Sequence, residues 1–161
     1  MLFRLNDVLP TDALKTLYST LLVPHLMYGI EIWYGILKSN DERLFKLQKK
    51  SIRAINCLPY AAHTNEYFKN MNLLKIEDLY KQRVMLYMFK SDNFSTNESI
   101  HNYSTRNANN IAVPFFNRSK TQNTIFYRGI IFWNNLPENM KIIRREDKFK
   151  YEVKTMLIDE Y

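Results

Sequence analysis

The segment between residues 39 and 58 combines an apolar pattern and a basic pattern, and together they constrain how the chain can fold. Placed on a helix at about 100° per residue, it divides into an apolar half and a basic half. The apolar half contains Leu44, Leu47, Ile52, Ala54, Ile55 and Leu58. The basic half contains Arg43, Lys46, Lys49, Lys50 and Arg53. Such a helix buries one side and leaves the other in water, so the segment predicts a surface helix of a packed domain.

The preceding segment, residues 11–36, is apolar on most sides of the helix that it predicts, which is typical of a core helix. Its apolar stripe steps by three or four residues through Leu14, Tyr18, Leu21, His25, Tyr28, Ile32 and Ile36. We therefore interpret His25 as a hydrogen-bonded core histidine. Pro24 removes a backbone donor and clashes with the preceding turn. We expect a kink near residues 20–24, or two helices end to end.

The whole chain has few residues that favour tight turns. It contains three glycines in 161 residues, against an average usage of about 7%. We predict a mainly α fold, with a thumb-like helical bundle in residues 1–90 and a smaller helical C-terminal module in residues 111–161. Asparagine and serine dominate residues 91–110, which we interpret as a polar linker. Residues 111–116 fit one short strand.

Charge and cysteine usage narrow the partners and the compartment. The net charge of +7 favours a polyanion or an anionic membrane surface. The longest uncharged stretch, residues 16–30, has 15 residues, fewer than the ~20 that span a bilayer. The start of the chain carries Arg4 and Asp7 inside what would be the apolar region of a secretory signal. With Cys57 as the single cysteine, we expect an intracellular protein, cytoplasmic or nuclear and not secreted, with no membrane partner.

Several short motifs follow one another in a fixed order. They are L-Y, P-H-L-M-Y-G and I-W within residues 17–33, L-Q-K-K-S-I-R-A-I in residues 47–55, A-H-T in residues 62–64, L-L-K-I-E-D-L in residues 73–79, T-R at Thr105 and Arg106, F-W-N-N-L-P in residues 132–137, and K-F-K before the terminal tyrosine. In this order they resemble the thumb and the region C-terminal to it in reverse transcriptases of non-LTR (LINE- or jockey-like) retrotransposons. The resemblance implies a thumb-like fold that binds template and primer.

The chain differs from that family in the residues that carry out catalysis. The family's palm carries a Tyr/Phe-x-Asp-Asp signature that binds the metals of nucleotidyl transfer, and no Asp-Asp pair occurs here. The endonuclease domain of the family is absent as well. The resemblance therefore implies a C-terminal part that binds nucleic acid without polymerising it. We expect no enzyme activity, no cofactor and no small-molecule substrate.

Other chemistry has little support in the sequence. Cys57 and His63 are six residues apart, and His25 and His101 lie in other segments, so no pair has the spacing of a metal site. Cys57 beside Leu58 and Pro59 is interpreted as buried. A nuclease-like E-x-K at Glu152–Lys154 arises easily by chance in a helix rich in acids and lysines.

The basic half of the segment 39–58 is the strongest binding signal. Arg43, Lys46, Lys49, Lys50 and Arg53 can neutralise several phosphates of RNA or of an RNA–DNA duplex; the alternative is a solvated lysine face. A smaller secondary patch contains Lys141, Arg144 and Arg145, whose acidic neighbours favour an ordinary surface.

Two further interpretations concern packing. Most of the aromatic residues lie at apolar helical spacing, so we expect them in the core rather than stacked on bases. These are Tyr18, Tyr28, Trp33, Phe45, Tyr87 and Trp133. A second function also stays open: the chain packs on the rest of a polymerase polypeptide, or on itself, without binding nucleic acid.

Overall fold

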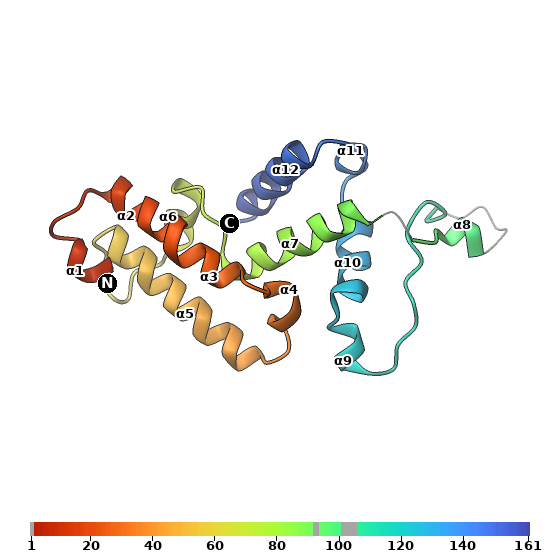
Figure 1. Ribbon diagram of the computed structural model, residues 1–161, viewed down its shortest axis with the longest axis horizontal. Helices are drawn as coiled ribbons and strands as arrows, with labels where there is room; N and C mark the ends of the chain where they lie inside the picture. Colours follow the sequence, from red (N-terminus) through yellow and green to blue (C-terminus); the bar gives the residue numbers. More distant parts are fainter. Residues whose placement is uncertain (1, 92–93, 101–105) are drawn as a thin grey trace. The chain divides into compact units, whose positions relative to one another are not determined.

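The computed structural model describes residues 2–91, 94–100 and 106–161. Figure 1 shows a chain of helices joined by loops. The helices of the N-terminal half are α1 (Leu2–Leu5), α2 (Thr11–Leu17), the π-helical turn η1 (Tyr18–Leu22), α3 (Val23–Met27), α4 (Ile30–Trp33), α5 (Lys38–Ile55), α6 (Asn65–Asn70) and α7 (Ile76–Lys90). Those that follow are α8 (Asn97–Ile100), α9 (Ser119–Gln122), α10 (Ile125–Asn134), α11 (Glu138–Lys141) and α12 (Glu146–Asp159).

The prediction of a mainly α fold is confirmed, since the described residues form helices and no β-strand. The short strand expected in residues 111–116 is wrong. Ile111 forms a single antiparallel bridge with Thr96, and in the described part of the chain residues 112–116 belong to no strand. The predicted motif residue Thr105 and the histidine His101 lie outside the described residues.

The chain divides into two compact units, which we call unit 1 and unit 2. Unit 1 contains Met1–Tyr80 and Lys154–Tyr161, and unit 2 contains Lys81–Val153. Helices α7 and α12 therefore each supply residues to both units. The units are groups of packed residues, and the division into domains at residues 90 and 111 stays a prediction.

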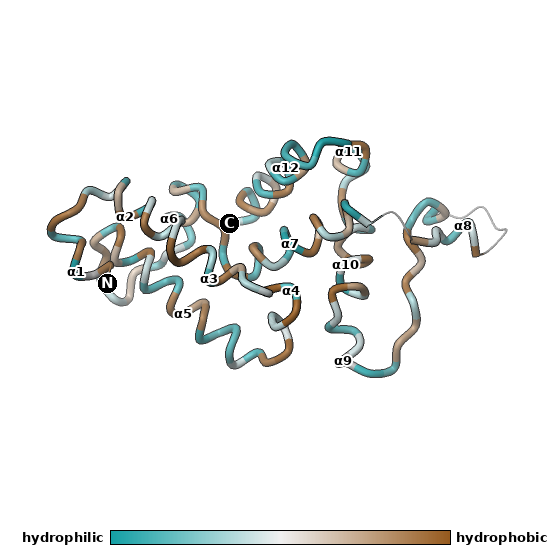
Figure 2. Tube along the Cα trace, in the orientation of Figure 1, coloured by the Kyte–Doolittle hydropathy of each residue, from teal (hydrophilic) through white to brown (hydrophobic). Residues whose placement is uncertain are grey.

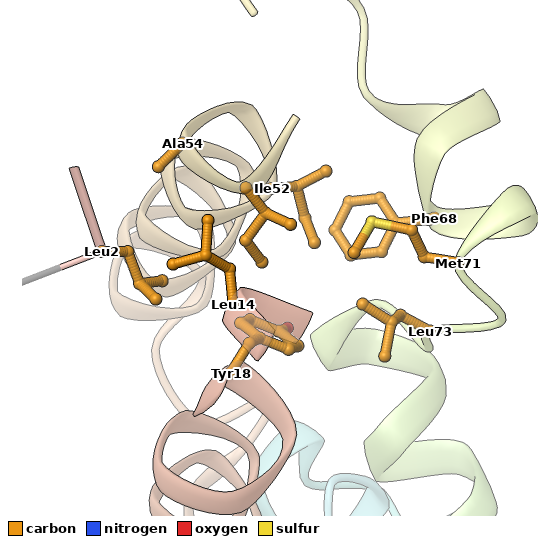
Figure 3. Packing of buried hydrophobic residues seen from close by; sticks show 9 residues of the cluster. Leu2, Leu14, Tyr18, Ile52, Ala54, Phe68, Met71 and Leu73 are labelled. Atoms are coloured by element: carbon orange, nitrogen blue, oxygen red, sulfur yellow. The ribbon is translucent and has the colours of Figure 1, made fainter. Parts of the chain in front are cut away.

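The core of unit 1 is formed by side chains from α1, α2, η1, α5 and α6 (Figure 3). The buried members of this cluster are Leu2, Leu14, Tyr18, Ile52, Ala54, Ile55, Phe68, Met71 and Leu73. Figure 3 shows Ile52 between Leu14 on one side and Phe68 on the other. The apolar half predicted for α5 thus faces the core at Ile52, Ala54 and Ile55, whereas Leu47 is exposed.

A buried polar side chain also contributes to this core. Gln48 is 2% exposed, and its amide nitrogen donates to the Tyr18 hydroxyl at 2.8 Å and to the Leu74 carbonyl at 2.9 Å. Its amide oxygen accepts from the backbone N–H of Ile76 at 2.9 Å. Because Ile76 is the first residue of α7, its N–H has no partner within the helix. Gln48 therefore satisfies five polar groups, its own two included, away from water.

The kink expected around Pro24 takes the form of the π-helical turn η1. The backbone N–H of Val23 bonds to the carbonyl of Tyr18, five residues back. Such a turn holds one residue more than an α-helical turn and accommodates a break in the regular pattern. Beyond it, α3 ends at Met27, and Gly29 adopts a left-handed conformation with φ of 59°.

Several core predictions fail in and after this turn, since Leu21, Ile32 and Ile36 of the predicted stripe are exposed. His25 is exposed, and Tyr28 is 86% exposed. The extra residue in η1 rotates the residues beyond it by about 100° relative to the expected stripe, and Tyr28 comes after the end of α3. The remaining predictions are mixed: Tyr18 is buried, Tyr87 is exposed, and Trp33, Phe45 and Trp133 are half-buried.

Aromatic rings contact one another in the interior of unit 2, beside aliphatic and methionine side chains. Phe149 of α12 is fully buried and stacks on Phe89 of α7, with ring centroids 4.6 Å apart. Trp133 of α10 lies 5.8 Å from Phe149 on the same measure. At Gly129 of α10 an added Cβ would meet the Met88 sulfur at 2.6 Å, so the glycine permits this close approach of α10 to α7.

Asn134 secures the chain segment that leads into α10. Its side-chain nitrogen donates to the Ile111 carbonyl at 2.8 Å, and its oxygen accepts from the Ile111 N–H at 2.9 Å. One side chain thus makes both hydrogen bonds that a neighbouring strand would make. Asn134 is the first asparagine of the F-W-N-N-L-P motif, so these two hydrogen bonds give that residue a structural role.

Candidate nucleic-acid interface

Helix α5 begins at Lys38 and ends at Ile55. The tube in Figure 2 alternates between hydrophilic and hydrophobic colours along α5, as expected for a helix with two unlike sides. Asp41 lies in the first turn and Arg53 in the last, an arrangement that the helix dipole favours. The dipole acts only within the terminal turns, so it does not account for the lysines in the middle of the helix.

We use the term basic face for the five cationic side chains predicted on α5. Arg43, Lys46 and Lys50 are exposed, and Lys49 and Arg53 are half-buried. In the described part of the chain, none of the five forms an ion pair with a carboxylate. The basic face is therefore a set of charges that the protein itself leaves uncompensated, and an anion can neutralise it without first displacing an acidic side chain.

The two half-buried cations are held in place by neighbouring groups. The Lys49 ammonium lies 4.3 Å from the centroid of the Phe45 ring, a cation–π distance. The Arg53 Nε donates to the Ala62 carbonyl at 3.0 Å, and its guanidinium carbon lies 5.8 Å from the Tyr60 ring centroid. Since one N–H of Arg53 is used in this bond, its terminal nitrogens keep donors for another acceptor.

These two residues line a pocket of unit 1 with a volume of about 570 Å³. Its other charged lining residues are Lys75 and Glu77, and Phe45, Ala61, Ala62, His63, Thr64 and Asn65 complete the wall. We call it the Lys49–Arg53 pocket. Three cations and one carboxylate surround it, which makes it electropositive. Lys75 is not predicted from the helical pattern, because it lies more than twenty residues from the basic face in the sequence.

Tyr161 contacts Lys75 through both its ring and its hydroxyl group. The Lys75 ammonium lies 3.8 Å from the Tyr161 ring centroid. The Tyr161 hydroxyl accepts from the Lys75 backbone N–H and donates to the Asp78 carboxylate, both at 2.8 Å. Burial raises the pKa of the Tyr161 phenol, and the neighbouring Asp78 carboxylate raises it further. Lys75 is thus fixed at the wall of the pocket by packing on a protonated phenol.

The secondary patch is divided by the structure. Lys141 pairs with the Glu138 carboxylate at 2.8 Å, whereas Arg144 and Arg145 are exposed and line a groove of about 340 Å³ together with Lys148. Nearby, Glu146 pairs with Lys90 at 2.7 Å. Acidic residues thus compensate part of the positive charge in this region, although Glu146 pairs with Lys90 and not with a cation of the patch. Whether the patch binds anything stays a prediction.

Cys57 differs from the prediction of a buried thiol. It is exposed, with φ of 52°, and its sulfur lies 3.2 Å from the Asn6 side-chain oxygen. It comes just after the end of α5, where the chain leaves the core. Among the described residues no group of three or more His, Cys, Asp or Glu side chains is arranged to hold a metal ion. Nor does any helix searched there have the length and apolar character needed to cross a bilayer.

The chain shows a partial similarity to a known protein. It is similar to the probable RNA-directed DNA polymerase from transposon BS of Drosophila melanogaster, with 31% identity over 99 residues. The match covers 62% of this chain and 11% of the length of that polymerase. No family model and no solved structure matches the chain. The resemblance to a transposon reverse transcriptase that the sequence motifs predict is therefore confirmed, and the chain is related to a limited part of an RNA-directed DNA polymerase.

Proposed function

We propose that this chain is a non-catalytic, C-terminal part of a non-LTR retrotransposon reverse transcriptase that grips RNA or an RNA–DNA duplex through the basic face of α5. The observation that carries the proposal is the uncompensated charge of that face. Five cations lie on one side of a single helix, and none pairs with a carboxylate of the described residues. The relationship to a transposon RNA-directed DNA polymerase supports a nucleic acid as the polyanion.

The dimensions of the basic face suit a phosphate backbone. From position 43 to position 53 an α-helix rises about 15 Å, which matches roughly four phosphates of one strand at about 3.4 Å of duplex axis each. Around the helix, the five positions cover an arc of about 120°. Such an arc presents all five side chains to one side, as a strand lying along the helix requires.

The sequence supports the non-catalytic part of the proposal. It lacks the paired aspartates with which the polymerases of this family bind their metals. The chain would then position template and product, while another part of a polymerase carries out nucleotidyl transfer.

Fluorescence anisotropy with an RNA–DNA hybrid across a salt series tests the proposal. If four or five phosphates are engaged, the logarithm of the binding constant falls with the logarithm of salt concentration at a slope of about −3 to −4. The triple variant Arg43→Gln, Lys46→Gln, Lys50→Gln removes the three exposed cations. We expect it to reduce the slope by about 2 and the affinity at low salt by roughly a hundredfold.

A second triple variant is the matched control. Arg4→Gln, Lys69→Gln, Lys150→Gln removes the same charge from exposed positions off the basic face. If both triple variants weaken binding equally, the net charge rather than the basic face binds the nucleic acid. If the folded wild type does not bind the hybrid at low salt, the proposal is wrong.

A second function is favoured by exposed apolar residues near α4. Tyr28, Ile32, Ile36 and Leu37 are all strongly exposed although they follow one another closely in the sequence. Apolar groups gathered on a surface commonly mark a contact with another protein. In this alternative the chain packs on the rest of a polymerase, or on itself, through residues 28–37. Sedimentation velocity of the wild type and of an Ile32→Ser, Ile36→Ser variant tests self-association: a wild-type dimer that the variant loses would favour it.

A further inference from the structure

We propose that the Lys49–Arg53 pocket binds one phosphate of an unpaired nucleotide whose base stacks on Tyr60. The inference rests on the proposed function and deepens it, because it identifies where a single strand continues beyond the duplex held by the basic face. It combines two features of unit 1 that the basic face alone does not explain: a cationic pocket at the C-terminal half of α5, and an exposed aromatic ring beside it.

The pocket supplies the contacts that a phosphate requires. Lys49 and Arg53 line it from α5 and Lys75 from the residue just before α7, and Glu77 is the carboxylate among its lining residues. Each of the three cations has its carbon stem or charge set against a ring or a carbonyl: Phe45 for Lys49, Ala62 for Arg53 and Tyr161 for Lys75. Pre-positioned cations lose less side-chain entropy on binding an anion than free ones do.

Tyr60 supplies a surface for a base. It is 79% exposed, so its ring contributes little to the core. Its position is nevertheless defined, because the Ala62 N–H donates to the Pro59 carbonyl at 3.0 Å and the Ala62 carbonyl accepts from Arg53. The loop that carries Tyr60 is thus closed on itself and tied to α5. Exposed aromatic rings beside a cationic groove are the arrangement with which proteins bind single strands.

The nucleotide must be unpaired for this arrangement to work. Inside a duplex both faces of a base are covered by its neighbours, and a side chain reaches only the edges of the base. A base that has left the duplex exposes a face that can stack on tyrosine. Because Arg53 belongs to the basic face, lines the pocket and lies over the Tyr60 ring, it connects the duplex contact with the single-strand contact.

The experiment compares a blunt RNA–DNA hybrid with the same hybrid carrying a short unpaired overhang, by anisotropy at one salt concentration. For the wild type we expect the overhang to raise the affinity about tenfold. Tyr60→Ala should abolish this gain, whereas Tyr60→Phe should keep it. The gain of each variant is measured against its own affinity for the blunt hybrid, because Tyr60 also contacts Arg53 of the basic face. Lys75→Gln, which removes a pocket cation that is not on α5, should reduce the gain. A fluorescent adenine analogue in the overhang should be quenched by the wild type and by Tyr60→Phe, and not by Tyr60→Ala.

The outcomes separate the two proposals. A gain from the overhang that persists in Tyr60→Ala overturns this inference, as does a wild type that binds both hybrids equally, and in either case the duplex contact of the basic face stands. A folded wild type that binds neither hybrid overturns both. Tyr151→Ala is the matched control, because Tyr151 is also exposed but lies in unit 2, and it should leave the gain intact.

Discussion

Unit 1 and unit 2 bury their interiors by different means. Unit 1 contains Gln48, a polar side chain whose amide is fully hydrogen-bonded among leucines and isoleucines. In unit 2, the interior around Phe149 is a set of aromatic rings in contact with one another. The comparison extends to the surface, where the basic face of unit 1 has no carboxylate partners in the described chain, while Lys141 and Lys90 of unit 2 are paired with acids.

The two units therefore differ in how strictly their interiors fix the arrangement of the side chains. Aromatic stacking depends on buried area and tolerates small shifts of one ring over another. A buried amide is satisfied in one arrangement only, since each lost hydrogen bond leaves a polar group unpaired. Unit 1, whose interior includes this amide, also carries the basic face, while unit 2 carries exposed cations at Arg144, Arg145 and Lys148 beside its ion pairs.

The largest expected effect is the loss of the aromatic stack. Phe149→Ala removes a fully buried ring and its contacts with Phe89 and Trp133, and we expect it to lower the free energy of unfolding by about 3–5 kcal/mol. Urea denaturation followed by circular dichroism measures the change. Phe115→Ala is the control, because Phe115 is 88% exposed and should change the stability by less than about 0.5 kcal/mol. Equal effects of the two variants would contradict the description of unit 2.

The second-largest effect on stability is expected from the loss of the buried Gln48 amide. Gln48→Met keeps the length and shape of the side chain but leaves the Leu74 carbonyl and the Ile76 N–H without partners, at an expected cost of about 2–4 kcal/mol. The same urea experiment applies. Leu47→Met, at an exposed neighbouring position of α5, should have almost no effect. A Gln48→Met variant as stable as the wild type would show that the core of unit 1 does not depend on this buried amide.

Alkaline pH should weaken unit 1 through Tyr18. Burial raises the pKa of its phenol from 10.0 to about 12, although the hydrogen bond from Gln48 lowers it. The unfolded chain then loses its proton first, so this contribution is complete below pH 10 and is lost as the pH rises from 10 to 12. Across that range it amounts to about 1–3 kcal/mol. Thermal unfolding of the wild type and of Tyr18→Phe at several pH values measures it, and identical pH dependence in both would contradict it.

The smallest effect is expected from the cationic groove of unit 2. The triple variant Arg144→Gln, Arg145→Gln, Lys148→Gln removes the exposed cations that line it. If the comparison between the two units holds for charge, the affinity for an RNA–DNA hybrid should fall by less than about threefold at moderate salt. A loss as large as that caused by neutralising the basic face would place the secondary patch in the interface, and the contrast between the units would be wrong.

The position of helix α5 follows from a local pattern in the sequence, the spacing of its apolar and basic residues. The basic face follows from the same spacing, since the wheel of one helix needs no knowledge of the rest of the fold.

The failures arise where distant residues decide the outcome. Tyr28 and His25 leave the core because one extra residue enters the turn η1, and the spacing of apolar residues does not mark that position. The single bridge at Ile111 replaces a strand because Asn134, more than twenty residues away, satisfies its backbone. In the same way the wall of the Lys49–Arg53 pocket depends on Lys75, and a pattern read within one helix does not reveal such contacts.

Gln48 also determines the register of α5. Its three partners come from η1, from the segment before α7 and from the first residue of α7. A slide of α5 by one helical turn, about 5.4 Å, or a rotation by one residue, would break all three bonds at once. Competing packings of the same apolar residues are thereby excluded. The hydrogen bonds of Gln48 thus fix the rotation of α5 about its axis. This rotation determines that the basic face, on the opposite side of the helix, is the side in contact with water.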